Sequence, residues 1–158
     1  MSFSPNGYLI ASASDDHTVK IWNAKSGKII HTLKGHSFGV NSVGYSPNGK
    51  LIASASSDDT IKIWNAKSGK IIHTLNGHSK WVTSVDFSPN GKFITSGSFD
   101  HTIKIWNAKS GEIAHTFKGH SNWVNSVSFS PDGQFIASAS SDNTVKIWDV
   151  ASGKVTNT

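Results

Sequence analysis

The stretch "GHSKWVTSVDFSPNGKFITSGSFDHTIKIWN", residues Gly77 to Asn107, decides the fold of this chain. It recurs with few changes over residues 35–65 and 119–149, and its middle part also opens the chain as "MSFSPNG". Two aromatic positions mark a period of 42 residues: Phe3, Tyr45, Phe87 and Phe129, and then Trp22, Trp64, Trp106 and Trp148. Self-similarity at this period indicates an array of small units that stack on one another.

Each unit has the pattern of four short strands. In the second unit we expect strands at about Val40–Tyr45, Leu51–Ser56, Thr60–Trp64 and Ile71–Leu75, separated by turns such as "SPNG" and "NAKSGK". No segment has a sustained helical period. A four-stranded meander cannot bury both faces alone, so the units have to stack around an axis. The sequence therefore predicts an all-β fold, a β-propeller of four-stranded antiparallel blades with four 42-residue blades per chain.

We expect one domain over residues 1–158, forming a propeller or half a propeller, with units at 1–33, 34–75, 76–117 and 118–158. Four full units need 168 residues, so the 158 present fall 10 short (168 − 158 = 10), and the shortfall corresponds to residues 33–42. The first unit thus lacks a Gly-His loop, and Met1 takes a site held by Val43 in the next copy. We expect the first blade to be the least stable.

The quoted stretch resembles the WD-repeat family, with its Gly-His opening and its Trp-Asp close. The resemblance covers essentially the whole chain, and such near-identical copies are similar to bacterial members of the family. One departure is visible, because three copies end in Trp-Asn and only Asp149 supplies the acid. The resemblance implies a propeller that acts as a protein-interaction scaffold, without cofactor or catalysis.

Composition excludes several classes of protein. Cysteine is absent, which removes disulfides and thiolate metal sites and fits a reducing compartment, so we predict a cytoplasmic location. No apolar stretch is long enough for a membrane span. The net charge of +5 comes from lysine without any arginine, and bidentate base or phosphate recognition usually relies on arginine. A nucleic-acid or polyanion partner is therefore disfavoured, although it stays an alternative.

Each complete unit contains a serine, a histidine and an aspartate that resemble a hydrolase triad. In the second unit, a turn near Asp58 places Ser54 roughly opposite Trp64, and His36 can join Asp58 to Ser54. The same set recurs as His78, Ser96, Asp100 and Trp106, and as His120, Ser138, Asp142 and Trp148. Enzymes seldom need one active site per repeat, and no oxyanion-hole motif accompanies the serine. We interpret the sets as structural hydrogen-bond networks and expect no enzyme, with a serine hydrolase as the alternative.

The remaining histidines and the repeated lysines carry little chemistry. His31, His73 and His115 fall once per blade and cannot converge on one metal ion, so we predict no metal site. One lysine of each unit directly precedes the Ile-Trp pair, and we expect these four lysines on a solvated face: Lys20, Lys62, Lys104 and Lys146.

The units differ mainly in the loops at one end of the predicted propeller. Strands of alternating direction bring the loops between successive blades and the turns between the second and third strands to the same end. The candidates for partner binding there are Phe38, Lys80, Trp81, Phe99, His101, Asn122 and Trp123. Aromatic residues beside polar ones are typical of interface anchors. Neutral drift of unconstrained loops explains the same differences, and both interpretations stay open.

Four blades left open would expose an apolar blade face at each end. We therefore predict a head-to-tail homodimer that closes an eight-bladed ring with two equivalent nicks. The alternative is a natural or engineered fragment that only assembles and binds no ligand.

Overall fold

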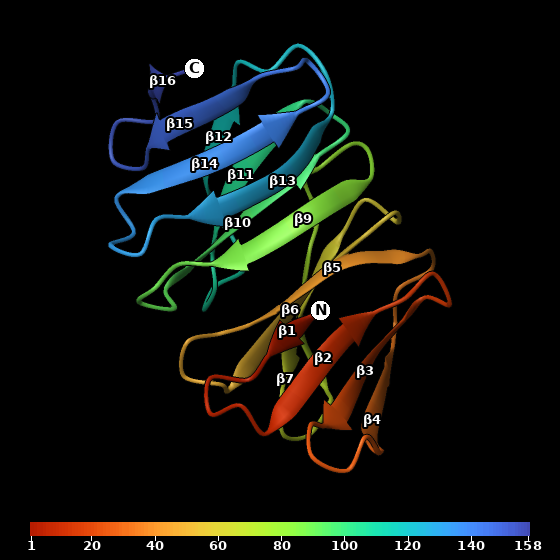
Figure 1. Cartoon of the computed structure of the whole chain (residues 1–158). Coiled ribbons are helices and arrows are strands. Elements are labelled where there is room, and N and C mark those ends of the chain that lie inside the picture. The colour runs from red at the N-terminus through yellow and green to blue at the C-terminus, as the bar shows by residue number, and fades with distance from the viewer.

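The computed structural model describes residues 1–158 and consists of sixteen β-strands without a helix (Figure 1). The strands pair in chain order into four antiparallel sheets of four strands, which we number as blades 1 to 4. Blades 1 and 2 comprise β1 (Ser2–Phe3), β2 (Leu9–Ala13), β3 (Thr18–Asn23), β4 (Ile29–Lys34), β5 (Val40–Tyr45), β6 (Leu51–Ser56), β7 (Ile61–Asn65) and β8 (Ile71–Leu75). Blades 3 and 4 comprise β9 (Val82–Phe87), β10 (Phe93–Ser98), β11 (Thr102–Asn107), β12 (Ile113–Lys118), β13 (Val124–Phe129), β14 (Phe135–Ser140), β15 (Val145–Asp149) and β16 (Val155–Asn157).

This arrangement confirms the predicted all-β fold of four four-stranded blades. In blade 2, three strands have the predicted bounds, and β7 lies one residue later than predicted because Thr60 belongs to the preceding turn. The boundaries predicted between the units stay a prediction.

The turn between the first and second strands of a blade is built by its Ser-Pro-Asn-Gly sequence. In blade 2, Ser46 Oγ donates to Asn48 Oδ1 (2.8 Å), and the same oxygen accepts the Lys50 N–H (3.0 Å). Gly49 has a φ of 69°, in the left-handed region that glycine enters without a steric penalty. Local hydrogen bonds thus fix the turn, which explains why its sequence hardly changes.

The Trp-Asn ending of three units performs the same task as the Trp-Asp ending of the fourth. Asn65 Oδ1 accepts the N–H groups of Lys67 (3.0 Å) and Ser68 (2.8 Å) in the turn after the third strand. Asp149 Oδ1 likewise accepts the Ser152 N–H at 2.7 Å. An acceptor oxygen is what this position needs, and the amide supplies it as well as the carboxylate does.

Adjacent blades pack through alternating apolar residues from their facing sides. Between blades 2 and 3, Ala53, Ile61 and Ile63 of one blade meet Val85 and Ile94 of the other, and all five side chains are buried. The two neighbouring junctions bury residues at the same repeat positions. The core is therefore three copies of one interface and not a single central cluster.

The innermost strands are also joined by hydrogen bonds across the blades. Val85 N donates to Ser42 Oγ (3.3 Å), and Val127 N donates to Ser84 Oγ (3.2 Å). At the next position, Phe129 N donates to Asp86 Oδ2 at 2.9 Å. A short polar side chain on one inner strand thus satisfies a backbone donor on the next, which fixes how neighbouring blades align.

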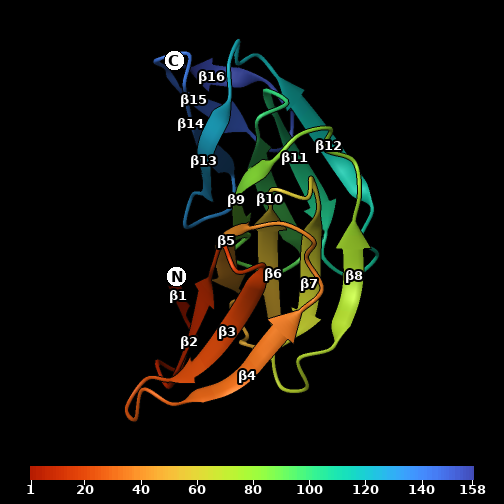
Figure 2. The ribbon, with the colours of Figure 1, turned by 90° about the vertical axis from the view of Figure 1, so that its right-hand side faces the viewer.

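The four blades follow one another along an arc, with β1, β5, β9 and β13 on its concave side and β4, β8 and β12 on its convex side (Figure 2). The outward sides of blades 1 and 4 are uncovered, as the exposure of Phe3 (64%) and Val145 (56%) shows. No helix in the structure could cross a membrane.

Candidate functional site

Blades 2, 3 and 4 each hold a chain of hydrogen bonds from aspartate to tryptophan. In blade 2, His36 Nδ1 lies 2.7 Å from Asp58 Oδ2, and His36 Nε2 lies 2.7 Å from Ser54 Oγ. The same oxygen of Ser54 accepts the Trp64 Nε1–H at 2.8 Å. Equivalent contacts of 2.7 to 2.8 Å join His78, Ser96, Asp100 and Trp106 in blade 3 and His120, Ser138, Asp142 and Trp148 in blade 4.

The register of the sheet refines the geometry expected from the sequence. Ser54 lies opposite Lys62, and Trp64 lies opposite Ile52, two residues along the strand. The indole therefore reaches Ser54 along the diagonal of the strand pair. A tryptophan is long enough to make this diagonal contact and to pack its rings against the neighbouring blade.

A neutral imidazole satisfies every donor and acceptor in the network of blade 2. The indole N–H can only donate, so Ser54 Oγ accepts it and turns its own hydrogen toward His36 Nε2. The Nδ1–H then donates to Asp58. Burial lowers the pKa of His36 despite the nearby carboxylate of Asp58, which favours this neutral form.

The aspartate that ends the network stays ionised. Burial works to raise the pKa of the Asp58 carboxyl, but the hydrogen bonds from Thr60 and His36 outweigh it and hold the pKa below its usual value. Asp58 Oδ1 accepts both the N–H (3.0 Å) and the hydroxyl (2.6 Å) of Thr60, and Oδ2 also accepts the Ser37 N–H (3.0 Å). The carboxylate thus connects the loop that enters the blade to the turn between its second and third strands.

The serines of these networks are closed off from solvent. Ser54 and Ser96 are 0% exposed and Ser138 is 2% exposed, and each hydroxyl already faces an indole and an imidazole. A nucleophile needs room for a carbonyl carbon at its oxygen. In this structure none of the three hydroxyls has that room.

Blade 1 has the serine, the aspartate and the tryptophan without a histidine. Trp22 Nε1 still donates to Ser12 Oγ at 2.8 Å. Asp16 Oδ2, whose counterparts face a histidine, instead lies 2.8 Å from the Lys20 ammonium. The hydrogen bond from Lys20 is the largest cause that lowers the pKa of Asp16. A lysine thus pairs with the aspartate in place of the histidine, but it does not connect the aspartate to the serine.

The expectation that the repeated lysines lie on a solvated face is wrong for the two middle blades. Lys62 and Lys104 are both buried, and their ammonium groups donate to Thr74 Oγ1 (2.9 Å) and Thr116 Oγ1 (3.0 Å). Their aliphatic stems lie within the sheet while the charged ends reach a hydroxyl on the outer strand.

The loop end of blades 3 and 4 carries a column of aromatic rings. The ring centroids of Trp81 and Phe99 are 5.5 Å apart at 22°, and those of Phe99 and Trp123 are 4.2 Å apart at 11°. Trp81 is 52% exposed and Trp123 is 44% exposed. The three rings border a cavity of about 420 Å³ that Lys80, Ser79 and Asp59 also line. Offset aromatic stacks give a rigid apolar surface with little conformational entropy to lose on binding.

Asp59 lines this site, and neither it nor Ser79 was among the candidates from the sequence. It occupies the turn between β6 and β7 with a φ of 67°, and its Oδ1 is buried without a hydrogen-bond partner. Burial, together with the nearby charges of Asp58 and Asp100, raises the pKa of the Asp59 carboxyl. The same turn position holds His17, His101 and Asn143 in the other blades, and this variation was the signal available in the sequence.

The other candidates for partner binding lie outside this cavity. Phe38 is 59% exposed and its ring lies 6.2 Å from that of His17 in blade 1. Asn122 folds back onto its own loop, where its Oδ1 accepts the Trp123 N–H at 2.8 Å. His101 occupies a turn with a φ of 69°. The structure therefore brings together Lys80, Trp81, Phe99 and Trp123, and it leaves these three residues apart from them.

No group of three or more histidine, aspartate or glutamate side chains is placed to hold a metal ion. Of the three outer-strand histidines, His73 uses its Nε2–H to bind the Lys109 carbonyl at 2.9 Å, and His115 lies against Phe117.

Comparison with known proteins places this geometry in a family. The family described as "Echinoderm microtubule-associated protein second beta-propeller" matches residues 1–158, the whole chain. The chain belongs to this family. Its repeats make it a WD-repeat propeller, as the resemblance seen in the sequence predicted.

Curated relatives are similar to this WD-repeat propeller over about one repeat each. The chain is 47% identical over 45 residues to nuclear distribution protein nudF of Aspergillus flavus and 44% identical over 45 residues to the lissencephaly-1 homolog of Monosiga brevicollis. It is 51% identical over 35 residues to F-box/WD repeat-containing protein 7 of Drosophila melanogaster. These matches cover 28%, 28% and 22% of the chain but only 10%, 11% and 3% of the relatives' own length. The WD-repeat architecture fits a protein-interaction scaffold.

Proposed function

We propose that this propeller is a non-catalytic scaffold that binds a protein or peptide through the aromatic column Trp81–Phe99–Trp123. The supporting observation is that two large, half-exposed indoles and a phenyl ring border a cavity beside a lysine and an aspartate. Aromatic anchors next to polar groups are the usual energetic centre of an interface. The partner predicted from the sequence is thus assigned to one part of the loop end.

A library of displayed random peptides tests this proposal. Peptides selected on the native chain are measured against Trp81→Gly, which installs the residue found at the equivalent position, Gly39. We expect their affinity to fall at least about tenfold, as loss of an interface anchor does. Phe38→Ala serves as the control, because Phe38 is equally exposed at the same end but lies outside the column, and it should leave the affinity unchanged. Enrichment of no peptide, or equal binding to Trp81→Gly, would contradict the proposal.

The absence of catalysis is part of the same proposal, supported by the burial of the three network serines. We expect no hydrolysis of generic p-nitrophenyl esters above the rate without protein. Hydrolysis that disappears in Ser96→Ala would instead support the hydrolase alternative. The cytoplasmic location stays a prediction.

We also propose that two chains assemble head to tail into an eight-bladed ring. The outward side of blade 1 presents Met1, Phe3 and Ile10 at the positions where blade 2 buries Val43, Tyr45 and Ile52. The outward side of blade 4 presents Ala137, Val145 and Ile147 at the positions where blade 1 buries Ala11, Val19 and Ile21. The two uncovered sides are thus the two halves of the interface already formed at each internal junction.

The polar groups of the inner strands fit the same pairing. Ser128 is exposed on β13 and holds the position of Ser2, whose Oγ accepts the Tyr45 N–H from blade 2 at 3.3 Å. In the ring, Ser128 would accept the Phe3 N–H of the second copy. Two such contacts form at once when two arcs close, so the second contact is intramolecular and favoured by effective concentration.

Light scattering in solution tests the ring. We expect twice the chain mass of 16.9 kDa, and we expect Val145→Asp to give the single-chain mass because it places a charge in the new junction. Ile30→Asp is the matched control, since Ile30 is 46% exposed on β4 and lies outside both uncovered sides. A single-chain mass for the native protein would refute the ring, and open-ended larger species would refute its closure. A dimer that survives Val145→Asp would place the contact elsewhere.

A further inference from the structure

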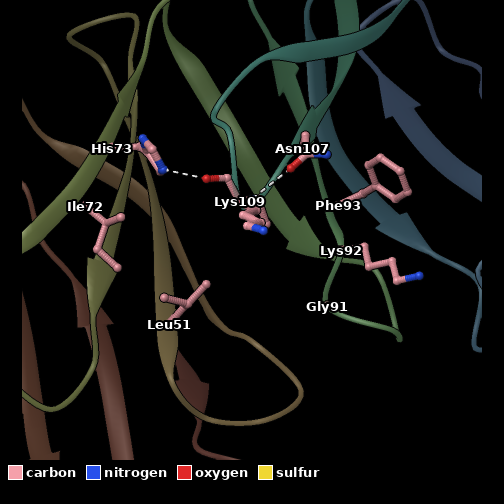
Figure 3. A pocket seen from close by; sticks show the side chains of 9 residues that line it. Leu51, Ile72, His73, Gly91, Lys92, Phe93, Asn107 and Lys109 are labelled. Atoms are coloured by element: carbon pink, nitrogen blue, oxygen red, sulfur yellow. Dashed lines mark hydrogen bonds between the residues drawn. The ribbon is translucent and has the colours of Figure 1, made fainter.

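A second cavity opens between blades 2 and 3 at the opposite end of the strands from the aromatic column. Its volume is about 540 Å³, and it lies where β10 begins, whereas Phe99 follows the end of that strand. Figure 3 shows Leu51 and Ile72 on the side of blade 2 and Lys92 on the side of blade 3, where the buried Ala108 adds a third apolar side chain. The walls are thus largely apolar, and they come from two blades.

Two polar side chains of the lining are already bound within the protein. His73 Nε2–H donates to the Lys109 carbonyl (2.9 Å), and Asn107 Oδ1 accepts the Lys109 N–H (2.9 Å), as the dashed lines in Figure 3 show. Among the groups that stay free are the ammonium groups of Lys92 and Lys109, which have no hydrogen bond or ion pair. No acidic residue lines the cavity, and Glu112, in the same turn as Lys109, pairs with neither lysine.

The fold does not need these two lysines. The cavity at the equivalent turns of blade 4, of about 380 Å³, has Gln134 in place of Lys92 and Ala151 in place of Lys109. It also has the carboxylate of Asp149 in place of the Asn107 amide. The same turns form there without either positive charge, so the charge between blades 2 and 3 is free to serve a ligand.

We propose that the cavity between blades 2 and 3 binds a small organic anion with an apolar body, such as a medium-chain or aryl carboxylate. The carboxylate pairs with the ammonium groups of Lys92 and Lys109, whose exposed side chains can turn toward it, and the apolar body lies over Leu51, Ile72 and Ala108. The volume falls within the range of about 300 to 1,000 Å³ that small-molecule sites occupy. The cavity is confined to one junction, which suits a small molecule rather than an extended chain.

Calorimetric titration of the full chain with octanoate tests the proposal, at octanoate concentrations below those that form micelles. Changes in the amide chemical shifts during the titration locate the site. We expect saturable binding with shifts at Lys92, Phe93 and Lys109, and no comparable binding of octanol. Lys92→Gln combined with Lys109→Ala copies the residues of blade 4 and should weaken octanoate binding about tenfold, as two solvent-exposed charge pairs would. The matched control is Lys50→Gln with Lys67→Ala, which removes the same charge at the equivalent positions between blades 1 and 2, where the structure has no cavity.

Each outcome decides the matter. Loss of binding in the first variant but not in the control supports the site, because the two variants carry the same net charge. Equal loss in both reports a general electrostatic effect and overturns it. Shifts centred on Val145 and Ile147 report adsorption to the uncovered side of blade 4 and also overturn it. An acidic peptide that binds the same amides more tightly than octanoate would refute the small-molecule class.

Discussion

Replacing Ser96 by alanine tests whether the buried networks hold the blades together. Ser96 Oγ accepts the Trp106 Nε1–H at 2.8 Å and faces His78 Nε2 at 2.8 Å. Alanine leaves both groups unpaired in places that water does not reach, since Trp106 is 1% exposed and the His78 side chain is 0% exposed. An orphaned buried polar group costs about 1 to 3 kcal/mol, so Ser96→Ala, which orphans two, should lower the free energy of unfolding by about 2 to 6 kcal/mol.

Blade 1 supplies the matched control for this substitution. Ser12 accepts the Trp22 Nε1–H at 2.8 Å, but it faces no histidine, and Trp22 is only half-buried. Ser12→Ala orphans one group that water can partly reach, so we expect a loss of about 1 kcal/mol or less. The same chemical change thus has two predicted costs, which differ because one blade has the full network and the other does not.

Urea unfolding followed by tryptophan fluorescence measures both variants, at one protein concentration because the proposed assembly would contribute to apparent stability. Equal costs for Ser96→Ala and Ser12→Ala would refute the reasoning, since they would show that the histidine contact contributes nothing. A cost below about 1 kcal/mol for Ser96→Ala would refute it as well, because both groups would then have found other partners.

Three other predictions follow from the same contacts. The melting temperature should fall as the pH drops below 6.5, because burial lowers the pKa of His36 in the folded state and the unfolded chain then takes up the proton first. It should fall further below pH 3.8, because the pKa of Asp58 is also lower in the folded state: burial works to raise it, but the hydrogen bonds from Thr60 and His36 outweigh burial. A melting temperature that is constant or rises from pH 7 to pH 5 would contradict this. Thr95→Val should raise the free energy of unfolding by about 1 kcal/mol, because the buried Thr95 hydroxyl has no partner and valine keeps its volume; destabilisation measured by urea unfolding would count against it. Amide hydrogen exchange should be fastest in blade 1, where β1 pairs at only two positions, and slower exchange there than in blades 2 and 3 would overturn that expectation.

The parts of this molecule that depend on one repeat could be predicted from the sequence. Turn residues and strand lengths set the register of each hairpin, and that register brings His36, Ser54, Asp58 and Trp64 together. Even the replacement of aspartate by asparagine after three tryptophans was harmless for a reason that one repeat contains, because the turn needs only an oxygen acceptor.

The parts that depend on how two repeats meet could not be predicted. Phe99 stacks on Trp123 of the next blade at 4.2 Å, and this distance depends on the angle between blades, which no local pattern specifies. The cavities beside Asp59 and Lys92 could not be predicted for the same reason, since each combines residues from neighbouring blades. The burial of Lys62 was missed for another reason. A lysine in an alternating strand pattern is expected to be exposed, unless the structure shows an acceptor for its ammonium group, here the Thr74 hydroxyl.

The repeated junction also bears on how such a protein can change length over evolutionary time. Deleting residues 55–96, which is 42 residues (96 − 54 = 42), joins Ser54 to Gly97 within one hybrid strand and keeps a complete set of His36, Ser54, Asp100 and Trp106. Recombination in phase therefore removes or adds a blade without inventing any contact, because each blade meets its neighbour through the same positions. Natural selection can then act on the number of blades directly, and under the proposed ring assembly only numbers that let copies of the arc close would survive.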